Sequence, residues 1–384
     1  MASLDPATAT SFRCDLVAAQ STVREGVCAG SDRATATHWS VWRTFCHELA
    51  IDPLLANISD PVSILQVFAV RYRSGQIAPH NKQVRGRTVE GALRSIGQTL
   101  ASLGAQDPRL TCTGGIDFRI QRMIAAYKKQ DPPPARVKPI PLAALRHIVS
   151  IAAASQSPRL LASAQMITLA FFFLLRPGEY TSTPSDTTPF TLADIQIFLG
   201  NVRLNITTSP NETLLQATFC TLEFTTQKNG VRGEVIGLGR SGSLLLCPVR
   251  ALAHRVIHLR CHNAPPGSPL GKYFVHGAWH DLKPKDITTD LRHAVSILGS
   301  SIGLVPSDVS ARSLRATGAM ALLCADIDHD RIKLVGRWRS DEMIRYLHVQ
   351  AAPVMSKFSK AMITSGDFRL IPNRHVTDPL VPLH

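Results

Sequence analysis

The sequence predicts a mainly α-helical protein with a small antiparallel β-sheet. Apolar residues recur at three- and four-residue spacing through residues 31–130, which is the period of an amphipathic helix. Residues 190–240 instead contain short β-rich runs, and helical periodicity returns from residue 288 onward. Because the chain has 384 residues and 45% of them are hydrophobic, it is long enough to bury the cores of two domains.

The first predicted domain is the helical stretch 31–130. It follows an N-terminal extension, residues 1–30, whose fold the sequence leaves open. An apolar stripe near the start of the domain is interpreted as core, and it is formed by Trp39, Trp42, Cys46 and Leu49.

A basic stretch, HNKQVRGRTVEGALRSIGQTL at 80–100, leads into and along a helix of this domain. Its side chains either form a solvated face or hold phosphate groups. The four cations concerned are Lys82, Arg85, Arg87 and Arg94.

A proline-rich segment, DPPPARVKPIP at 131–141, is the predicted linker. It has five prolines in eleven residues and cannot continue a helix. The second predicted domain is therefore 142–365, and the tail 366–384, which has no periodicity, is expected to be extended.

The second domain begins with helical texture and then changes period. The runs ADIQIFLGNVRLNI, LLQATFCTLEFTT and VRGEVIGLG are predicted strands. Between the last two lies QKNG at 227–230, whose Asn-Gly pair is favoured in tight hairpins, so Lys228 is predicted at or beside a hairpin tip.

The charge of the chain limits its partners. Lysine and arginine total 42 against 28 acidic residues, a formal net charge of +14, which predicts a polyanionic partner such as nucleic acid. A membrane partner is not expected, because the basic residues are spread along the chain and the longest apolar run, MITLAFFFLL at 166–175, is about half a bilayer span.

The start of the chain and its cysteines indicate an intracellular protein without a metal. The opening MASLDPATATSFRCDL lacks the basic segment and apolar run of a secretory signal. The eight cysteines are scattered without any Cys-x-x-Cys pair, which argues against a disulfide framework and a structural zinc site.

Five places in the second half combine into one chemical pattern. The first place is LLRPGEY, which contains Arg176 and Glu179, and the second is Lys228 at the hairpin. The third is SARSLRATGAM, which contains two arginines. The fourth is GRW at 336–338, and the fifth is the tyrosine of IRYLHV. The two arginines, three apart, are expected to share a face of one helix. The residues of the last three places are Arg312, Arg315, Trp338 and Tyr346.

This order resembles the catalytic domain of the tyrosine recombinases, which break and rejoin DNA through a phosphotyrosine. The form GRWRSDEMIRY, together with DFRIQR and DPPPARVKP upstream, is most similar to Crypton-type recombinases of eukaryotic mobile elements, over about residues 30–350. The resemblance implies a helical, SAM-like core-binding domain followed by an α+β catalytic domain, and residence in the nucleus.

The resemblance also implies a role for each residue of the pattern. Arg176 and Arg315 would stabilise charge on the phosphate oxygens, and Tyr346 would form a 3′-phosphotyrosine. Lys228 would protonate the leaving 5′-oxygen, and Glu179 would hold Arg176 or a neighbouring backbone in place. No metal, ATP or other cofactor is implied.

Two positions depart from the usual family pattern. Arg312 stands where histidine or lysine is common, and arginine donates hydrogen bonds but cannot act as a base at neutral pH. Before Tyr346, counting back nine residues gives Arg337, whereas matching by residue type gives Trp338. We favour Trp338 as the phosphate donor, with Arg337 as a DNA contact.

The implied partner is double-stranded DNA, gripped by both domains, with no small-molecule substrate. The basic stretch at 80–100 would contact phosphates, and Arg136 and Lys138 of the linker would lie near the backbone. Recombination would require self-association on DNA, as a tetramer, with the tail docked on a neighbouring subunit.

Three alternatives stay open. The chain could be a catalytically silent DNA-binding protein derived from a recombinase, which Arg312 favours, or a type IB topoisomerase with related chemistry. A metal-dependent nuclease fits less well, because the closely spaced Asp326, Asp328 and Asp330 are interpreted as a helix-capping turn.

Overall fold

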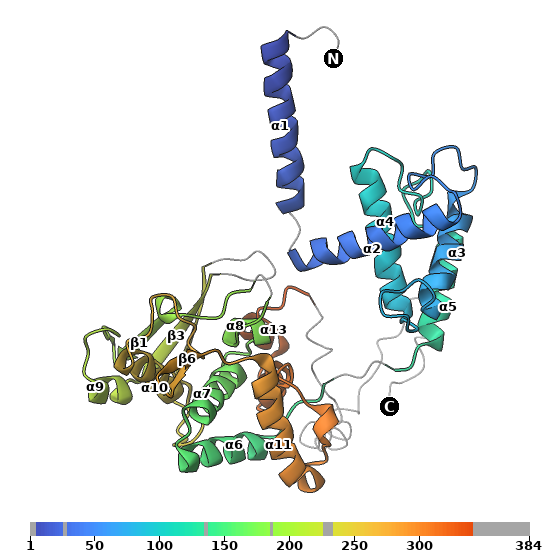
Figure 1. Ribbon diagram of the computed structural model, residues 1–384. Helices are drawn as coiled ribbons and strands as arrows, with labels where there is room; N and C mark the ends of the chain where they lie inside the picture. The colour runs from blue at the N-terminus through green and yellow to red at the C-terminus, as the bar shows by residue number, and fades with distance from the viewer. Residues whose placement is uncertain (1–4, 26–28, 134–136, 185–186, 226–232, 341–384) are drawn as a thin grey trace, which may run out of the picture. The chain divides into compact units, whose positions relative to one another are not determined.

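The computed structural model describes residues 5–25, 29–133, 137–184, 187–225 and 233–340 (Figure 1). The chain divides into two compact units, Met1–Ala135 and Arg136–His384. The division falls inside the proline-rich segment, where the backbone lacks the N–H groups that a continuous helix needs.

The first unit is built from helices. They are α1 (Pro6–Glu25), α2 (Ala29–Glu48), α3 (Pro61–Ser74), α4 (Gly86–Ser102) and α5 (Phe118–Gln130). Helix α1 lies in the extension whose fold the sequence analysis left open. Its start is capped by Asp5, whose Oδ1 accepts from the backbone N–H groups of Ala7 and Thr8 at 3.0 and 3.1 Å, with Pro6 in the first turn.

The core of the first unit is aromatic at its centre. The rings of Trp42 and Phe45 each pack against Phe68 with centroids 5.3 Å apart, and all three are buried. Cys46 is also buried, whereas Leu49 of the predicted stripe is exposed. Helix α2 ends at Glu48, so Leu49 no longer follows the helical period.

The second unit combines helices with two small sheets. Its helices are α6 (Leu142–Ser155), α7 (Pro158–Phe172), α8 (Pro177–Tyr180), α9 (Asn211–Gln216), α10 (Pro248–Cys261), α11 (Pro284–Ile302), α12 (Ser313–Cys324) and α13 (His329–Gly336), with short 3-10 turns at Leu192–Asp194 and Pro306–Asp308. Its strands are β1 (Ile195–Leu199), β2 (Val202–Arg203), β3 (Phe219–Phe224), β4 (Glu234–Gly239), β5 (Tyr273–Val275) and β6 (Ala278–His280).

The larger sheet is antiparallel, in the order β2-β1-β3-β4, and β5 pairs with β6. The prediction of a mainly helical protein with a small antiparallel sheet is confirmed. One predicted strand begins too early, because Asn211–Gln216 form helix α9; Pro210 precedes it, and proline suits a helix start. Strands β3 and β4 flank the segment that contains Lys228, which lies outside the described residues.

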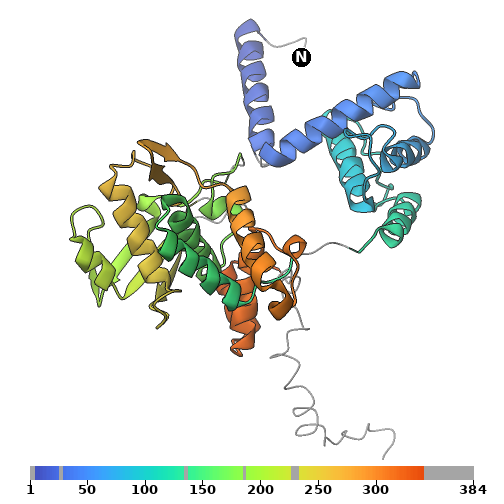
Figure 2. The same ribbon diagram turned by 60° about the horizontal axis from the view of Figure 1, so that its bottom comes forward.

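Helix α7 occupies the middle of the second unit. It packs against α6, α10 and α12, and Figure 2 shows the green α6 and α7 beside the orange helices that follow in the chain. The C-terminal part of the proline-rich segment joins this unit, because the Ile140 N–H donates to Thr317 Oγ1 at 2.8 Å. Among the described residues, no helix combines the length and apolarity that a bilayer span requires.

Helices α7 and α12 approach each other closely at Gly318. A Cβ at this position would overlap the carbonyl oxygen of Phe171 in α7. Only glycine allows this approach, which brings the start of α12 to the turn that follows α7.

Replacing Gly318 with alanine is therefore expected to lower the free energy of unfolding by about 1–3 kcal/mol, the usual cost of overpacking. The control is Gly91→Ala in α4, where no described atom lies within 4 Å of an added Cβ. That change is expected to be neutral or to stabilise by about 0.5–1 kcal/mol. Denaturant unfolding of the two variants measures the difference, and equal effects would contradict the close contact.

Candidate functional site

The turn after α7 positions the first candidate cation. Arg176 precedes α8, and Glu179 folds back on it: Oε2 accepts from the Arg176 backbone N–H at 2.7 Å and Oε1 from Nη1 at 2.9 Å. The Glu179 side chain is 4% exposed and that of Arg176 is 26% exposed. The carboxylate thus closes the turn and holds one guanidinium at the surface.

The same carboxylate binds a second arginine in the interior. Arg337 Nη2 lies 3.1 Å from Glu179 Oε2, and the Arg337 side chain is 1% exposed. Its Nη1 donates to the carbonyls of Phe173 and Val335, both at 3.1 Å, and its guanidinium lies 3.7 Å from the centroid of the Phe224 ring. Arg337 is therefore buried: Glu179 and backbone carbonyls bind its Nη1 and Nη2, while its Nε has no hydrogen-bond partner among the described residues, and its contact with DNA stays a prediction.

The third arginine of the site is Arg315, which is 3% exposed. Its Nη1 donates to the Leu174 carbonyl at 2.8 Å, and its Nη2 donates to the Gly336 carbonyl. The Leu174 carbonyl also accepts from Arg337 Nη2 at 3.3 Å. Arg176, Arg315 and Arg337 are thus joined through two acceptors, the Glu179 carboxylate and the Leu174 carbonyl, and we name these five residues the arginine network.

Trp338 packs on this network. The guanidinium carbon of Arg315 lies 4.1 Å from the centroid of its ring, in a cation–π contact. A Cβ at Gly336 would overlap the same ring, so the glycine lets the indole fold back over the end of α13. Trp338 therefore helps to orient Arg315 through the face of its ring.

Tyr180 connects the two arginine motifs and was missed in the sequence. Its buried hydroxyl donates to the carbonyl of Ala311 at 2.9 Å, directly before Arg312. A tyrosine at the end of LLRPGEY gives no sequence signal for this contact, since its partner is 131 residues away. The hydrogen bond ties the turn after α7 to the start of α12.

The two arginines expected to share a helix face have different surroundings. Arg312 is the residue just before α12 and is exposed, whereas Arg315 is the third residue of the helix and is buried. The backbone of Arg312 is itself in the right-handed helical region (φ −70°, ψ −21°), so the two arginines differ in burial and not in helical spacing.

Electrostatics favour an anion at this site. The network has three guanidinium groups and one carboxylate, which leaves an excess of positive charge. Burial lowers the pKa of Arg337 to about 10, against the opposing effect of Glu179, so Arg337 stays charged at neutral pH. A phosphate approaching the exposed Arg176 would meet a cation held in a fixed orientation.

Other predicted residues lie apart from the network or outside the described residues. Tyr346, Lys228 and Arg136 lie outside them. Lys138 is exposed, and its Nζ forms an ion pair with Asp308 Oδ2 at 2.9 Å. The hydrogen bond from Lys138 lowers the pKa of the Asp308 carboxyl. To bind a DNA phosphate, Lys138 would have to exchange this partner.

The basic stretch of the first unit is on the surface. All four of its cations are exposed: Lys82, Arg85, Arg87 and Arg94. Arg87 and Arg94 both belong to α4 and are seven residues apart, so they lie on the same face of the helix. Arg85 is the residue just before the helix.

The described residues give no metal site. No group of three or more His, Cys, Asp or Glu side chains among them is placed to hold a metal ion. Asp328 caps α13 by accepting from the Asp330 N–H, so the interpretation of this aspartate-rich turn as a helix cap is confirmed.

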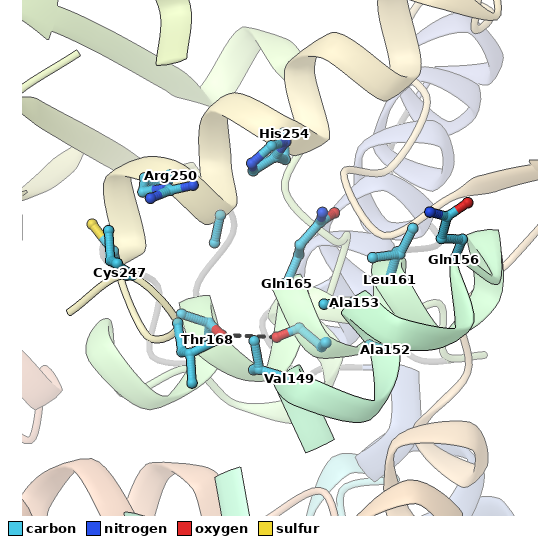
Figure 3. A pocket seen from close by; sticks show the side chains of 14 residues that line it. Val149, Ala152, Ala153, Gln156, Leu161, Gln165, Thr168, Cys247, Arg250 and His254 are labelled. Carbon is cyan, nitrogen blue, oxygen red and sulfur yellow. Dashed lines mark hydrogen bonds between the residues drawn. The ribbon is translucent and has the colours of Figure 1, made fainter. Parts of the chain in front are cut away.

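A cavity of about 490 Å³ lies elsewhere in the second unit, between α6, α7 and α10 (Figure 3). Figure 3 shows Arg250 and His254 of α10 across from Thr168 and Gln165 of α7. No residue of the arginine network lines it, and its lining is mostly apolar.

Comparisons with known proteins bear on the fold. No protein-family model matches the chain, and no curated protein sequence matches it. Among solved structures, the Tn1549 transposon integrase in complex with circular intermediate DNA is similar at 12% identity and a TM-score of 0.50, over 91% of this chain and 99% of that one. The XerA recombinase has 14% identity and a TM-score of 0.36, over 91% and 96%.

The same integrase with transposon right-end DNA has 10% identity and a TM-score of 0.45, over 86% of this chain and 99% of that one. At such identities, the comparison with a TM-score of 0.50 shows a shared fold. The fold expected from the sequence, that of tyrosine recombinase catalytic domains, is thereby confirmed.

Removing the charge of Glu179 is expected to cost stability. Glu179→Gln leaves Arg337 buried without a counter-charge, and losing one partner of a buried ion pair costs about 3–5 kcal/mol. The control is Asp308→Asn, which removes the charge that pairs with the exposed Lys138 and should cost less than about 1 kcal/mol. Denaturant unfolding of the full chain compares them, and a similar cost for both changes would contradict the buried pairing.

Proposed function

We propose that this protein is a tyrosine recombinase that cleaves and rejoins DNA through a 3′-phosphotyrosine on Tyr346. The observation that supports this proposal most is the arginine network, which links Arg176 to Arg315. The network includes Arg337, which precedes Tyr346 by nine residues in the chain. The fold shared with the Tn1549 integrase supports the same proposal. That integrase is described in complex with DNA.

In the proposed reaction, the Tyr346 phenol oxygen attacks the scissile phosphorus and the bond to the 5′-oxygen breaks. The leaving 5′-oxygen takes a proton from Lys228 and becomes a hydroxyl. Because the phosphotyrosine conserves the energy of the broken bond, a 5′-hydroxyl can attack it in reverse, so neither ATP nor a metal is needed. Arg176 and Arg315 stabilise the negative charge that spreads over the non-bridging oxygens.

Glu179 and Arg337 act in this proposal through the other two arginines. Glu179 orients Arg176, and Arg337 joins Glu179 to the Leu174 carbonyl that also binds Arg315. Both are positioning residues. Of the two candidates for the penultimate position, Trp338 is the one whose ring stacks on the guanidinium of Arg315, which supports it as the donor to the phosphate.

The proton of Tyr346 has to leave without a histidine at position 312. The exposed Arg312 adds a cation, and cations near a phenol favour its ionised form. In our proposal, Arg312 therefore stabilises the phenolate electrostatically, and water or a DNA oxygen accepts the proton.

We propose that the protein acts in the nucleus on the ends of a Crypton-type mobile element, with four copies assembled on two DNA sites. The basic stretch of the first unit contacts phosphates, and Arg136 and Lys138 lie near the DNA backbone.

A second candidate function is a silent DNA-binding protein derived from a recombinase. It is favoured by Arg312, which cannot serve as a base, and by Arg337, which occupies the count-matched position but is buried. In that case the arginine network would bind a phosphate without cleavage.

Tyr346→Phe is expected to abolish covalent attachment to DNA while leaving DNA affinity within about twofold, since one hydroxyl is lost and no cation is removed. Duplexes selected for binding from a random pool and then nicked would be incubated with each protein and separated under denaturing conditions. An adduct with the wild type that disappears in the variant supports the recombinase. Salt-dependent binding without an adduct in either protein supports the silent binder.

Removing phosphate contacts from α4 is expected to weaken binding to all sequences alike. Arg87→Gln and Arg94→Gln should each reduce the slope of log affinity against log salt by about 1, the value for one lost phosphate contact. Arg119→Gln removes the same charge from an arginine already paired with Asp60 and Asp117 and should change the slope less. Equal slopes for all three variants would remove α4 from the DNA interface.

A further inference from the structure

The cavity between α6, α7 and α10 has a buried apolar floor (Figure 3). Three small residues of the floor, one from each helix, are buried: Ala152, Ala164 and Ala251. Leu244 and Leu245 also line the cavity but are 81% and 44% exposed, although leucine side chains are usually buried. The volume of about 490 Å³ lies within the range of small-molecule sites, about 300–1,000 Å³. The cavity can therefore bury the apolar body of a small molecule.

The charge at the cavity is positive. Arg250 and His254 line it from α10, and they share a face of that helix because they are one turn apart. Among the described residues, no acidic side chain lines the cavity, and the half-buried guanidinium of Arg250 forms no hydrogen bond or ion pair. A cation without a counter-charge beside an apolar cavity favours an anionic group there.

A second arginine lies behind the cavity wall. Arg255 is fully buried, and its guanidinium donates to the Leu270 carbonyl at 2.7 Å, to the Lys272 carbonyl and to Gln165 Oε1 at 3.3 Å. All three acceptors are uncharged. Burial lowers the pKa of Arg255 to about 9, so it stays charged at neutral pH. Buried charges are normally paired, and no described carboxylate pairs with this one.

Arg255 also orients a hydrogen-bond donor of the cavity. Gln165 of α7 lines the cavity, and its side-chain oxygen is engaged by Arg255. The amide nitrogen of Gln165 is then left to donate to a ligand. Figure 3 shows the Gln165 side chain across from Arg250 and His254.

His254 adds a neutral donor to the same wall. Burial lowers its pKa, and so do the positive charges of Arg250 and Arg255. The imidazole is therefore neutral at neutral pH, with one ring N–H to donate. The effect of both arginines on His254 shows that their positive potential extends to the cavity.

We propose that this cavity binds a small amphipathic carboxylate, such as a medium-chain fatty acid, with its apolar chain on the alanine floor and its carboxylate on Arg250. The planar guanidinium fork fits the two oxygens of a carboxylate. The ligand also supplies the negative charge that the buried Arg255 lacks. The site is separate from the arginine network, no residue of which lines the cavity, so the inference does not depend on DNA cleavage.

The test uses isothermal titration calorimetry on the full chain without DNA, with decanoate and the uncharged decanol as probes. Decanoate should bind the wild type with a dissociation constant below about 100 µM, and decanol at least about tenfold more weakly. Arg250→Gln should weaken decanoate binding at least about tenfold, because a hydrogen bond to a charged group is lost, and should leave decanol binding within about twofold. Unchanged decanol binding also shows that this variant keeps the cavity intact.

Two further variants separate the cavity from the overall charge. Arg146→Gln removes the same charge from an exposed arginine of α6 that does not line the cavity, and it should leave decanoate binding within about twofold. Ala153→Trp fills the cavity from an exposed position of α6 and should weaken the binding of both probes at least about tenfold.

Three results would overturn the proposal. They are a wild-type chain that binds no decanoate up to about 1 mM, equal binding of decanoate and decanol, and equal weakening by Arg250→Gln and Arg146→Gln. Because no DNA is present, each of these results leaves the proposed recombinase activity unaffected.

Discussion

The buried carboxylate of Glu179 is the group on which the candidate site depends. It closes the turn after α7 through the Arg176 backbone, and it holds Arg176 at the surface and Arg337 in the interior. An ionised carboxylate costs too much to bury without partners, and so does a guanidinium. Each of the three side chains is therefore stable where it is because of the other two. A phosphate site needs this kind of rigidity, because a cation that must reorganise during the reaction loses much of its effect.

The backbone at Leu174 supplies the second constraint. Its φ is 51°, in the left-handed region, which costs a non-glycine residue roughly 1–2 kcal/mol. Its carbonyl accepts from both Arg315 and Arg337, and hydrogen bonds to charged groups contribute about 1.5–3 kcal/mol each, which exceeds that cost. The end of α7, the start of α12 and the end of α13 meet at this carbonyl, and the chain to Tyr346 continues from there.

Sequence patterns predicted what depends on local spacing. The β-rich runs across 190–240 and the Asn-Gly pair predicted the antiparallel sheet, and the three-residue spacing of Arg176 and Glu179 predicted a carboxylate that orients a guanidinium. The burial of Arg337 could not be predicted, since it depends on Glu179 and Phe173, more than 150 residues away in the chain. The hydrogen bond from Tyr180 to the Ala311 carbonyl could not be predicted for the same reason, because the two residues are 131 apart in the chain. The fold of residues 1–30 was left open, although Asp5 and Pro6 are local signals for the start of helix α1.

The central claim is that Arg176, held by Glu179, neutralises a phosphate oxygen as the DNA strand is cut. A duplex with an uncharged methylphosphonate at the position that wild-type protein cleaves tests this most directly. We expect Arg176→Ala to form no adduct with ordinary DNA but to form one with the methylphosphonate duplex, because the missing phosphate charge no longer needs the arginine. An Arg176→Ala protein that binds the methylphosphonate duplex as tightly as wild type and still forms no adduct would contradict the claim.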